Sequence, residues 1–112
     1  MPAPSPAFLC RYAVDITLAA GQAQSVDVPI NGARNWMAAI KNTGGANNIT
    51  ALTVASSPLG NLFEDAASVT SGIPITPGST LGVRGTGEPA TTVRLTLTST
   101  SGTTVSIEAG GW

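Results

Sequence analysis

The sequence contains no histidine and a single cysteine, and each scarcity removes common kinds of chemistry. Histidine is the most frequent general base in enzymes and the most frequent transition-metal ligand, so the standard hydrolase triads are excluded. With Cys10 alone, neither an internal disulfide nor a thiolate metal cluster can form. We expect Cys10 to be a small buried apolar side chain, because no histidine is present to activate its thiol.

Charged residues are also scarce, since they make up 10% of the 112 residues. A typical soluble domain has about a quarter. A surface rich in Thr and Ser with so few charges favours a protein that is largely covered by neighbours; a secreted β-domain with a hydroxyl-rich face is the alternative. The net charge is −1 and the five basic residues are scattered, so nothing resembles the basic surface that nucleic acid requires. We therefore expect no nucleic-acid partner.

The acidic residues do not form a recognisable catalytic or metal site. Asp15, Asp27 and Glu108 occupy positions that we predict to face outward from strands, where water would solvate them. Glu64 and Asp65 could contribute to a calcium site, but their neighbours offer no spaced series of further ligands. We therefore predict no catalytic residue, no metal and no cofactor, and infer that the protein is not an enzyme.

The first nine residues differ in composition from the rest. They lack a basic region followed by a long apolar run, so we expect synthesis in the cytoplasm without a signal peptide. No stretch of the chain is long and apolar enough for a bilayer, so no membrane partner is expected. Alternating prolines favour an extended arm over residues 1–9, with a disordered tail as the alternative. Its candidate interface residues are Pro2, Pro4, Pro6, Phe8 and Leu9.

From residue 10 onward, apolar and polar residues alternate with the period of two that is typical of half-buried strands. The clearest examples are residues 11–18, 25–30, 92–98 and 104–109, and shorter candidates lie at 49–55, 66–70 and 81–83. Trp36–Asn42 is apolar on both faces, which predicts a central strand covered on two sides. In the irregular segment 57–65, Leu62 and Phe63 are predicted to pack back onto the core.

Seven or eight short strands without an amphipathic helix predict one all-β domain over residues 10–112. One buried and one hydroxyl-rich face on each strand indicates an antiparallel β-sandwich that follows the extended N-terminal arm. Jelly-roll and immunoglobulin-like topologies both fit this pattern, and the sequence does not separate them. The Cys–Trp–Cys pattern of true immunoglobulin domains is absent.

The two tryptophans call for different interpretations. Trp36 lies in the most apolar strand, so we expect it in the core rather than stacked on a sugar. Trp112 follows Gly110 and Gly111, which together suggest a flexible tether. On such a tether the indole could anchor in a partner's pocket, or it could fold back and cap its own sandwich. Trp112 is therefore a further candidate interface residue.

The Pro-rich arm, the strand series rich in Thr, Ser and Gly, and the apolar C-terminal tip together resemble small β-sandwich proteins of tailed-phage virions. Among these, the chain is most similar to capsid decoration, or cement, proteins. The likeness lies in the style of the whole chain rather than in a motif. The resemblance implies a non-enzymatic protein, made in the host cytoplasm, that binds the outside of the virion shell and stabilises the phage head.

The same resemblance implies the major capsid protein or another virion protein as partner, and a homo-oligomer, with a trimer favoured. Two other classes remain open. One is another virion part, such as a tail or head-fibre subunit. The other is a carbohydrate-binding β-sandwich module, which would display exposed aromatic side chains beside polar loops.

Overall fold

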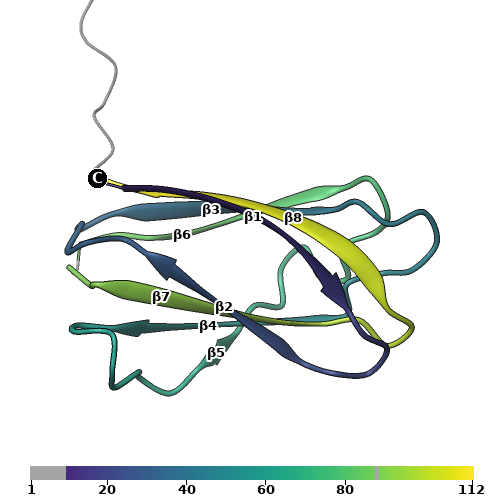
Figure 1. Ribbon diagram of the computed structural model, residues 1–112, viewed down its shortest axis with the longest axis horizontal. Coiled ribbons are helices and arrows are strands. Elements are labelled where there is room, and N and C mark those ends of the chain that lie inside the picture. The colour runs from purple at the N-terminus through teal and green to yellow at the C-terminus, as the bar shows by residue number, and fades with distance from the viewer. Residues whose placement is uncertain (1–9, 88) are drawn as a thin grey trace, which may run out of the picture.

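The computed structural model describes residues 10–87 and 89–112, so the predicted arm with Pro2, Pro4, Pro6, Phe8 and Leu9 lies outside the described residues. The described residues form eight β-strands and no helix, which confirms the predicted all-β sandwich (Figure 1). No helix long and apolar enough to cross a membrane occurs among them. The strands are β1 (Cys10–Leu18), β2 (Gln24–Pro29), β3 (Trp36–Asn42), β4 (Ala51–Ser57), β5 (Ala67–Ser68), β6 (Thr80–Gly85), β7 (Thr92–Thr98) and β8 (Thr103–Gly111).

The strands form two four-stranded sheets with the orders β1-β8-β3-β6 and β2-β7-β4-β5. Each strand of the first half pairs antiparallel with its mirror image in the second half: β1 with β8, β2 with β7, β3 with β6 and β4 with β5. This is the pattern of one long hairpin that is rolled up. The antiparallel pairing of β3 with β8 completes one sheet, and that of β4 with β7 completes the other. The topology left open by the sequence is therefore the jelly roll.

The two sheets lie face to face as two layers (Figure 1). The core between them consists of aliphatic side chains from alternating strand positions. In β7, for example, Val93, Leu95 and Leu97 are at most 1% exposed, whereas the residues between them point outward. Burying each such side chain contributes about 1.5–3 kcal/mol to stability. The period-two pattern in the sequence thus predicted correctly which side chains of β7 face the core.

Strand β3 differs from its prediction in one respect. It is central in its sheet, between β8 and β6, but only its inner face is covered. Ala38 and Ile40 are buried there, whereas Met37 and Lys41 on the outer face are exposed. Trp36 is half-buried and packs against the core cluster, as expected of an apolar anchor. The uncovered outer face of this sheet becomes part of the candidate site.

A buried polar network closes one end of the sandwich around Asn42, which is 0% exposed. Its Nδ2 donates hydrogen bonds to the Asn47 carbonyl at 2.8 Å and to the Ile75 carbonyl at 2.9 Å. Its Oδ1 accepts from the Gly44 N–H at 3.1 Å and from Thr103 Oγ1 at 2.8 Å. Because all four bonding positions of the amide are used, this end of the molecule satisfies its own polar groups.

Candidate functional site

Three loops and the last residue of the chain meet at the opposite end of the sandwich, which we call the Trp112 end. It comprises residues 30–35, 58–66, 89–91 and Trp112, and lies on the left in Figure 1. Backbone hydrogen bonds join these segments: Trp112 N–H donates to Asn35 O at 2.8 Å, and Ile30 N–H donates to Thr91 O at 2.9 Å. Thr91 N–H in turn donates to Ser57 O at 2.9 Å, next to the 58–66 loop.

The backbone of Trp112 is paired with that of Asn35, and this pairing corrects the expectation of a flexible tether. Gly110 and Gly111 belong to β8, which continues to Gly111. Gly111 is buried, and a Cβ there would lie 2.8 Å from Ala33 Cβ and 3.2 Å from Cys10 Sγ. A side chain at this position would clash, so glycine permits close packing here rather than flexibility. Trp112, which follows, is 41% exposed.

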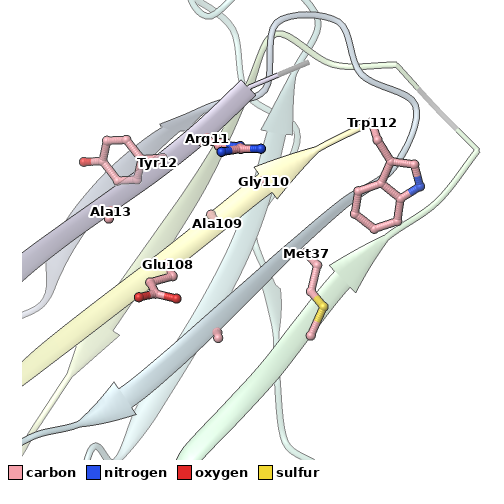
Figure 2. Close-up of a pocket in the computed structure, with 9 residues that line it drawn as sticks. Arg11, Tyr12, Ala13, Met37, Glu108, Ala109, Gly110 and Trp112 are labelled. Atoms are coloured by element: carbon pink, nitrogen blue, oxygen red, sulfur yellow. The ribbon is translucent and has the colours of Figure 1, made fainter. Parts of the chain in front are cut away.

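Small residues on the outer face of the β1-β8-β3-β6 sheet create a hollow next to Trp112. Strand register places Gly110 between Arg11 and Met37, and Glu108 in the adjacent row between Ala13 and Ala39. The hollow has a volume of about 550 Å³, and Figure 2 shows Met37 and the Trp112 indole at its side. We call it the outer hollow, and its lining residues include Arg11, Ala13, Met37, Ala39, Gly110 and Trp112.

The outer hollow combines an apolar surface with charged groups. Arg11 and Glu108 line it directly. Arg84 lies opposite Met37 in the register, and a Cβ on Gly82 would be 3.3 Å from Met37 Cε and 3.8 Å from an Arg84 guanidinium nitrogen. Within the described residues, no three His, Cys, Asp or Glu side chains gather as a metal site would require. The hollow can therefore bind by apolar burial and by charge pairing.

The loop between β4 and β5 exposes two large apolar side chains. Leu59 is 80% exposed and Leu62 is 82% exposed, whereas core leucines such as Leu95 are 0% exposed. We call Leu59 and Leu62 the apolar tip. The prediction that Leu62 packs back onto the core is therefore wrong. Its neighbour Phe63 is half-buried, so the two adjacent residues point to different surroundings.

Hydrogen bonds fix the loop that carries the apolar tip. Gly60 N–H donates to Ser57 Oγ at 2.8 Å, and Thr91 Oγ1 donates to the Pro58 carbonyl. On the other side of the tip, the Glu64 carboxylate accepts from Ser56 Oγ at 2.8 Å and from Ser56 N–H at 3.2 Å. Glu64 thus braces the loop that carries the apolar tip. A braced loop loses less conformational entropy on binding than a loop that has to become ordered.

An ion pair next to Phe63 supports the same loop. Arg94 Nε lies 2.7 Å from Asp27 Oδ1 and Arg94 Nη2 lies 3.0 Å from Asp27 Oδ2, which is a bidentate arrangement. The guanidinium carbon also lies 3.9 Å from the centroid of the Phe63 ring. Hydrogen bonding to Arg94 lowers the pKa of Asp27, and the same hydrogen bonds raise the pKa of Arg94. Phe63 is thereby clamped beneath a charged pair on the sheet surface.

The structure thus places one of the sequence-predicted interface residues, Trp112, at the edge of the outer hollow. Sequence reasoning missed Met37, Leu59 and Leu62. Met37 sits in a run that is apolar on both faces, so its exposure has no local signal. Leu59 and Leu62 lie in an irregular segment that contains Pro58 and Gly60. The sequence of such a segment does not indicate whether its leucines are exposed to solvent or pack onto the core, and packing was the prediction for Leu62.

No family model matches the sequence, and no curated protein matches it significantly. The structure is similar to that of chitosan-binding module 1 from a Paenibacillus sp. IK-5 chitosanase/glucanase, with 15% identity over 92% of this chain and 77% of that chain and a TM-score of 0.53. It is also similar to a Yersinia pseudotuberculosis-derived mitogen, with 10% identity, coverage of 92% and 86%, and a TM-score of 0.52. A structure of the infectious bursal disease virus Gx strain matches with 13% identity, coverage of 99% and 35%, and a TM-score of 0.38.

At these identities the likeness shows the fold alone, and a jelly roll carries many functions. The class that fold and site define is therefore a jelly-roll β-sandwich with an apolar end. Its function has to be argued from that end.

Proposed function

We propose that the chain is a non-enzymatic structural part of a virion, in the form of a capsid decoration protein that binds the outside of the shell. One observation carries the proposal. The large apolar side chains that the described residues leave exposed, which are Met37, Leu59, Leu62 and Trp112, all lie at or next to the Trp112 end.

Single exposed apolar residues are normal on protein surfaces, but apolar residues gathered at one end indicate an interaction site. The opposite end is polar instead, and the amide of Asn42 forms hydrogen bonds with the polar groups that surround it there. The chain also carries only 10% charged residues. This polarity supports a protein that attaches by the Trp112 end and presents its polar end to solvent.

The first described residue lies at the same end of the molecule. Cys10, which begins β1, pairs with Gly111, the residue before Trp112. We propose that the arm and the Trp112 end together contact the major capsid protein or another virion protein, with the decoration protein acting as a homo-oligomer. The apolar residues Phe8 and Leu9 would then be covered by that partner.

Uptake by shells assembled from a candidate major capsid protein tests this proposal. The purified full chain should bind at a saturable ratio of copies to capsid subunits, and a chain reduced to residues 10–112 should keep its fold but bind more weakly. Trp112→Ala should weaken binding about tenfold or more, as expected for a central aromatic anchor. Thr17→Ala, an exposed change elsewhere on β1, is the matched control. Unchanged uptake by the truncated chain and by Trp112→Ala would contradict the proposal.

A carbohydrate-binding module is the second candidate, because the half-exposed Trp112 indole shares the outer hollow with Arg11 and Glu108. An aromatic face beside charged groups is a plausible seat for a sugar ring. A glycan array decides between the two. Saturable glycan binding that Trp112→Ala abolishes would favour this candidate, and an array without any bound glycan would remove it.

A further inference from the structure

We infer that the apolar tip of one copy docks into the outer hollow of a second copy, so that the chain assembles head to tail. The partner is another copy of this chain because one molecule carries both complementary surfaces. Leu59 and Leu62 are 80% and 82% exposed on a projecting loop, and the outer hollow is a depression of about 550 Å³ on a different sheet. This contact gives a physical basis for the homo-oligomer in the proposed function, but it is formed without a shell.

The two surfaces are of opposite kinds, because one is a depression on a sheet and the other is a pair of exposed leucines on a loop. The small residues Ala13, Ala39 and Gly110 are among those that line the outer hollow. Met37 and Trp112 stand at one side of it (Figure 2). A hollow of this size falls within the range that encloses a small apolar group. The tip is convex and its loop is hydrogen-bonded on both sides, from Ser57 to Gly60 and from Ser56 to Glu64. Docking would therefore need little rearrangement of either surface.

The charges beside the two surfaces are complementary as well. Glu64 and Asp65 directly follow the apolar tip, and residues 42–83 contain no lysine or arginine. The register row through Met37 carries Arg11 at one side of the outer hollow and Arg84 at the other. Glu108 is the acidic residue that lines the hollow. An acidic apolar tip thus meets a hollow with Arg11 in its lining and Arg84 one strand beyond Met37, and these two cations outnumber Glu108. This charge balance favours the correct pairing over other encounters.

Tip and hollow are different patches, so the contact is heterologous rather than two-fold symmetric. Such a contact leaves one tip and one hollow unused in every dimer, and it closes into a ring or grows into a filament according to the rotation between copies. A ring of three copies is the form that agrees with the proposed trimer. In such a ring every apolar tip and every outer hollow is covered by a neighbouring copy, so the proposed shell contact would fall to the arm and to the loops 30–35 and 89–91 of the Trp112 end.

Sedimentation velocity of the purified full chain, over a wide concentration range and without any capsid protein, tests the inference. The wild type should self-associate. The tip variant Leu59→Ser/Leu62→Ser should associate roughly 100-fold more weakly, as expected for the loss of two buried leucines. The hollow variant Ala39→Tyr, which fills the hollow, should also be monomeric. Asn61→Ser in the tip loop and Thr17→Tyr on the same sheet face are the matched controls and should associate like the wild type.

Mixing the two variants distinguishes this contact from any other. The hollow variant keeps its tip and the tip variant keeps its hollow, so an equimolar mixture should form a one-to-one dimer that grows no further. Circular dichroism checks that each variant is folded. Asp65→Lys and Arg84→Asp provide an independent pair that leaves the apolar surfaces intact: each alone should weaken association, and a mixture of the two single variants should associate at least as well as either one alone.

A wild type that stays monomeric, a tip variant that associates normally, or a mixture without a heterodimer would each overturn the inference. A monomeric chain that still binds shells would refute the head-to-tail contact and leave the decoration role standing. A chain that self-associates but binds no shell would support the head-to-tail contact and refute the decoration role.

Discussion

Replacing Asn42 with alanine should destabilise the sandwich by about 3 kcal/mol. The change removes four hydrogen bonds, to the carbonyls of Asn47 and Ile75 and from Gly44 N–H and Thr103 Oγ1. At about 1 kcal/mol for each, the four bonds would contribute about 4 kcal/mol. The loss is reduced because water can reach the half-buried Gly44 and Asn47, and because the Ile75 carbonyl keeps a bond from Ile49 N–H at 3.0 Å.

Urea unfolding followed by circular dichroism measures this loss as a shift in midpoint at an unchanged slope. Asn48→Ala in the adjacent exposed loop is the matched control and should stay within about 0.5 kcal/mol of the wild type. Asn42→Asp sharpens the test, because an aspartate keeps both acceptor roles but points its charge at the Asn47 and Ile75 carbonyls. Its stability should recover partly as the carboxylate is protonated in acid. A cost below about 1 kcal/mol for Asn42→Ala would refute the assigned role of the network.

Three further changes probe other features. Gly111→Ala should cost about 1–3 kcal/mol in urea unfolding, because its Cβ would lie 2.8 Å from Ala33 Cβ, whereas Gly45→Ala, where a Cβ meets nothing within 4 Å, should change little. Asp27→Asn should make the free energy of unfolding depend less on pH in acid. The pKa of Asp27 in the folded protein lies below its ordinary value of 3.8. The ionised carboxylate therefore stabilises the fold fully above pH 3.8, and this stabilisation is lost as the pH falls through the folded pKa. A profile with an unchanged acid slope would contradict this role. Trp36→Phe leaves Trp112 as the only tryptophan, and Trp112 is partly exposed. Its fluorescence emission should shift to shorter wavelength when the protein self-associates. An unshifted spectrum would place Trp112 outside the contact.

Local sequence patterns predicted the strands well but said little about how they pair. The alternation of Val93, Leu95 and Leu97 with polar residues identifies a half-buried strand and its inner face. No local sequence pattern indicates that β1 pairs with β8, because Cys10 and its partner Gly111 lie at opposite ends of the described chain. The jelly-roll order depends on such long-range pairs, so the sequence left two topologies open.

The candidate site was harder to predict because its features arise from tertiary structure. Asn42 ends the predicted strand and begins a run of Asn, Thr and Gly that is typical of an exposed loop, and only the fold shows that it is completely buried. Gly110 and Gly111 suggested flexibility, but one lines the outer hollow and the other is a packing contact. Whether an apolar residue faces the core or solvent in an irregular loop depends on the neighbouring strands, as Leu62 and Phe63 illustrate.

The central claim is that the Trp112 end is an apolar surface made to be covered in an assembly. Hydroxyl-radical footprinting with mass spectrometry tests it most directly, by comparing side-chain oxidation in the dilute free protein with that in its assembled form. Met37, Leu59, Leu62 and Trp112 should be strongly oxidised in the free protein and protected together in the assembly, while the exposed Thr17 and Lys41 react equally in both. Equal oxidation of the four residues in both states would contradict the claim.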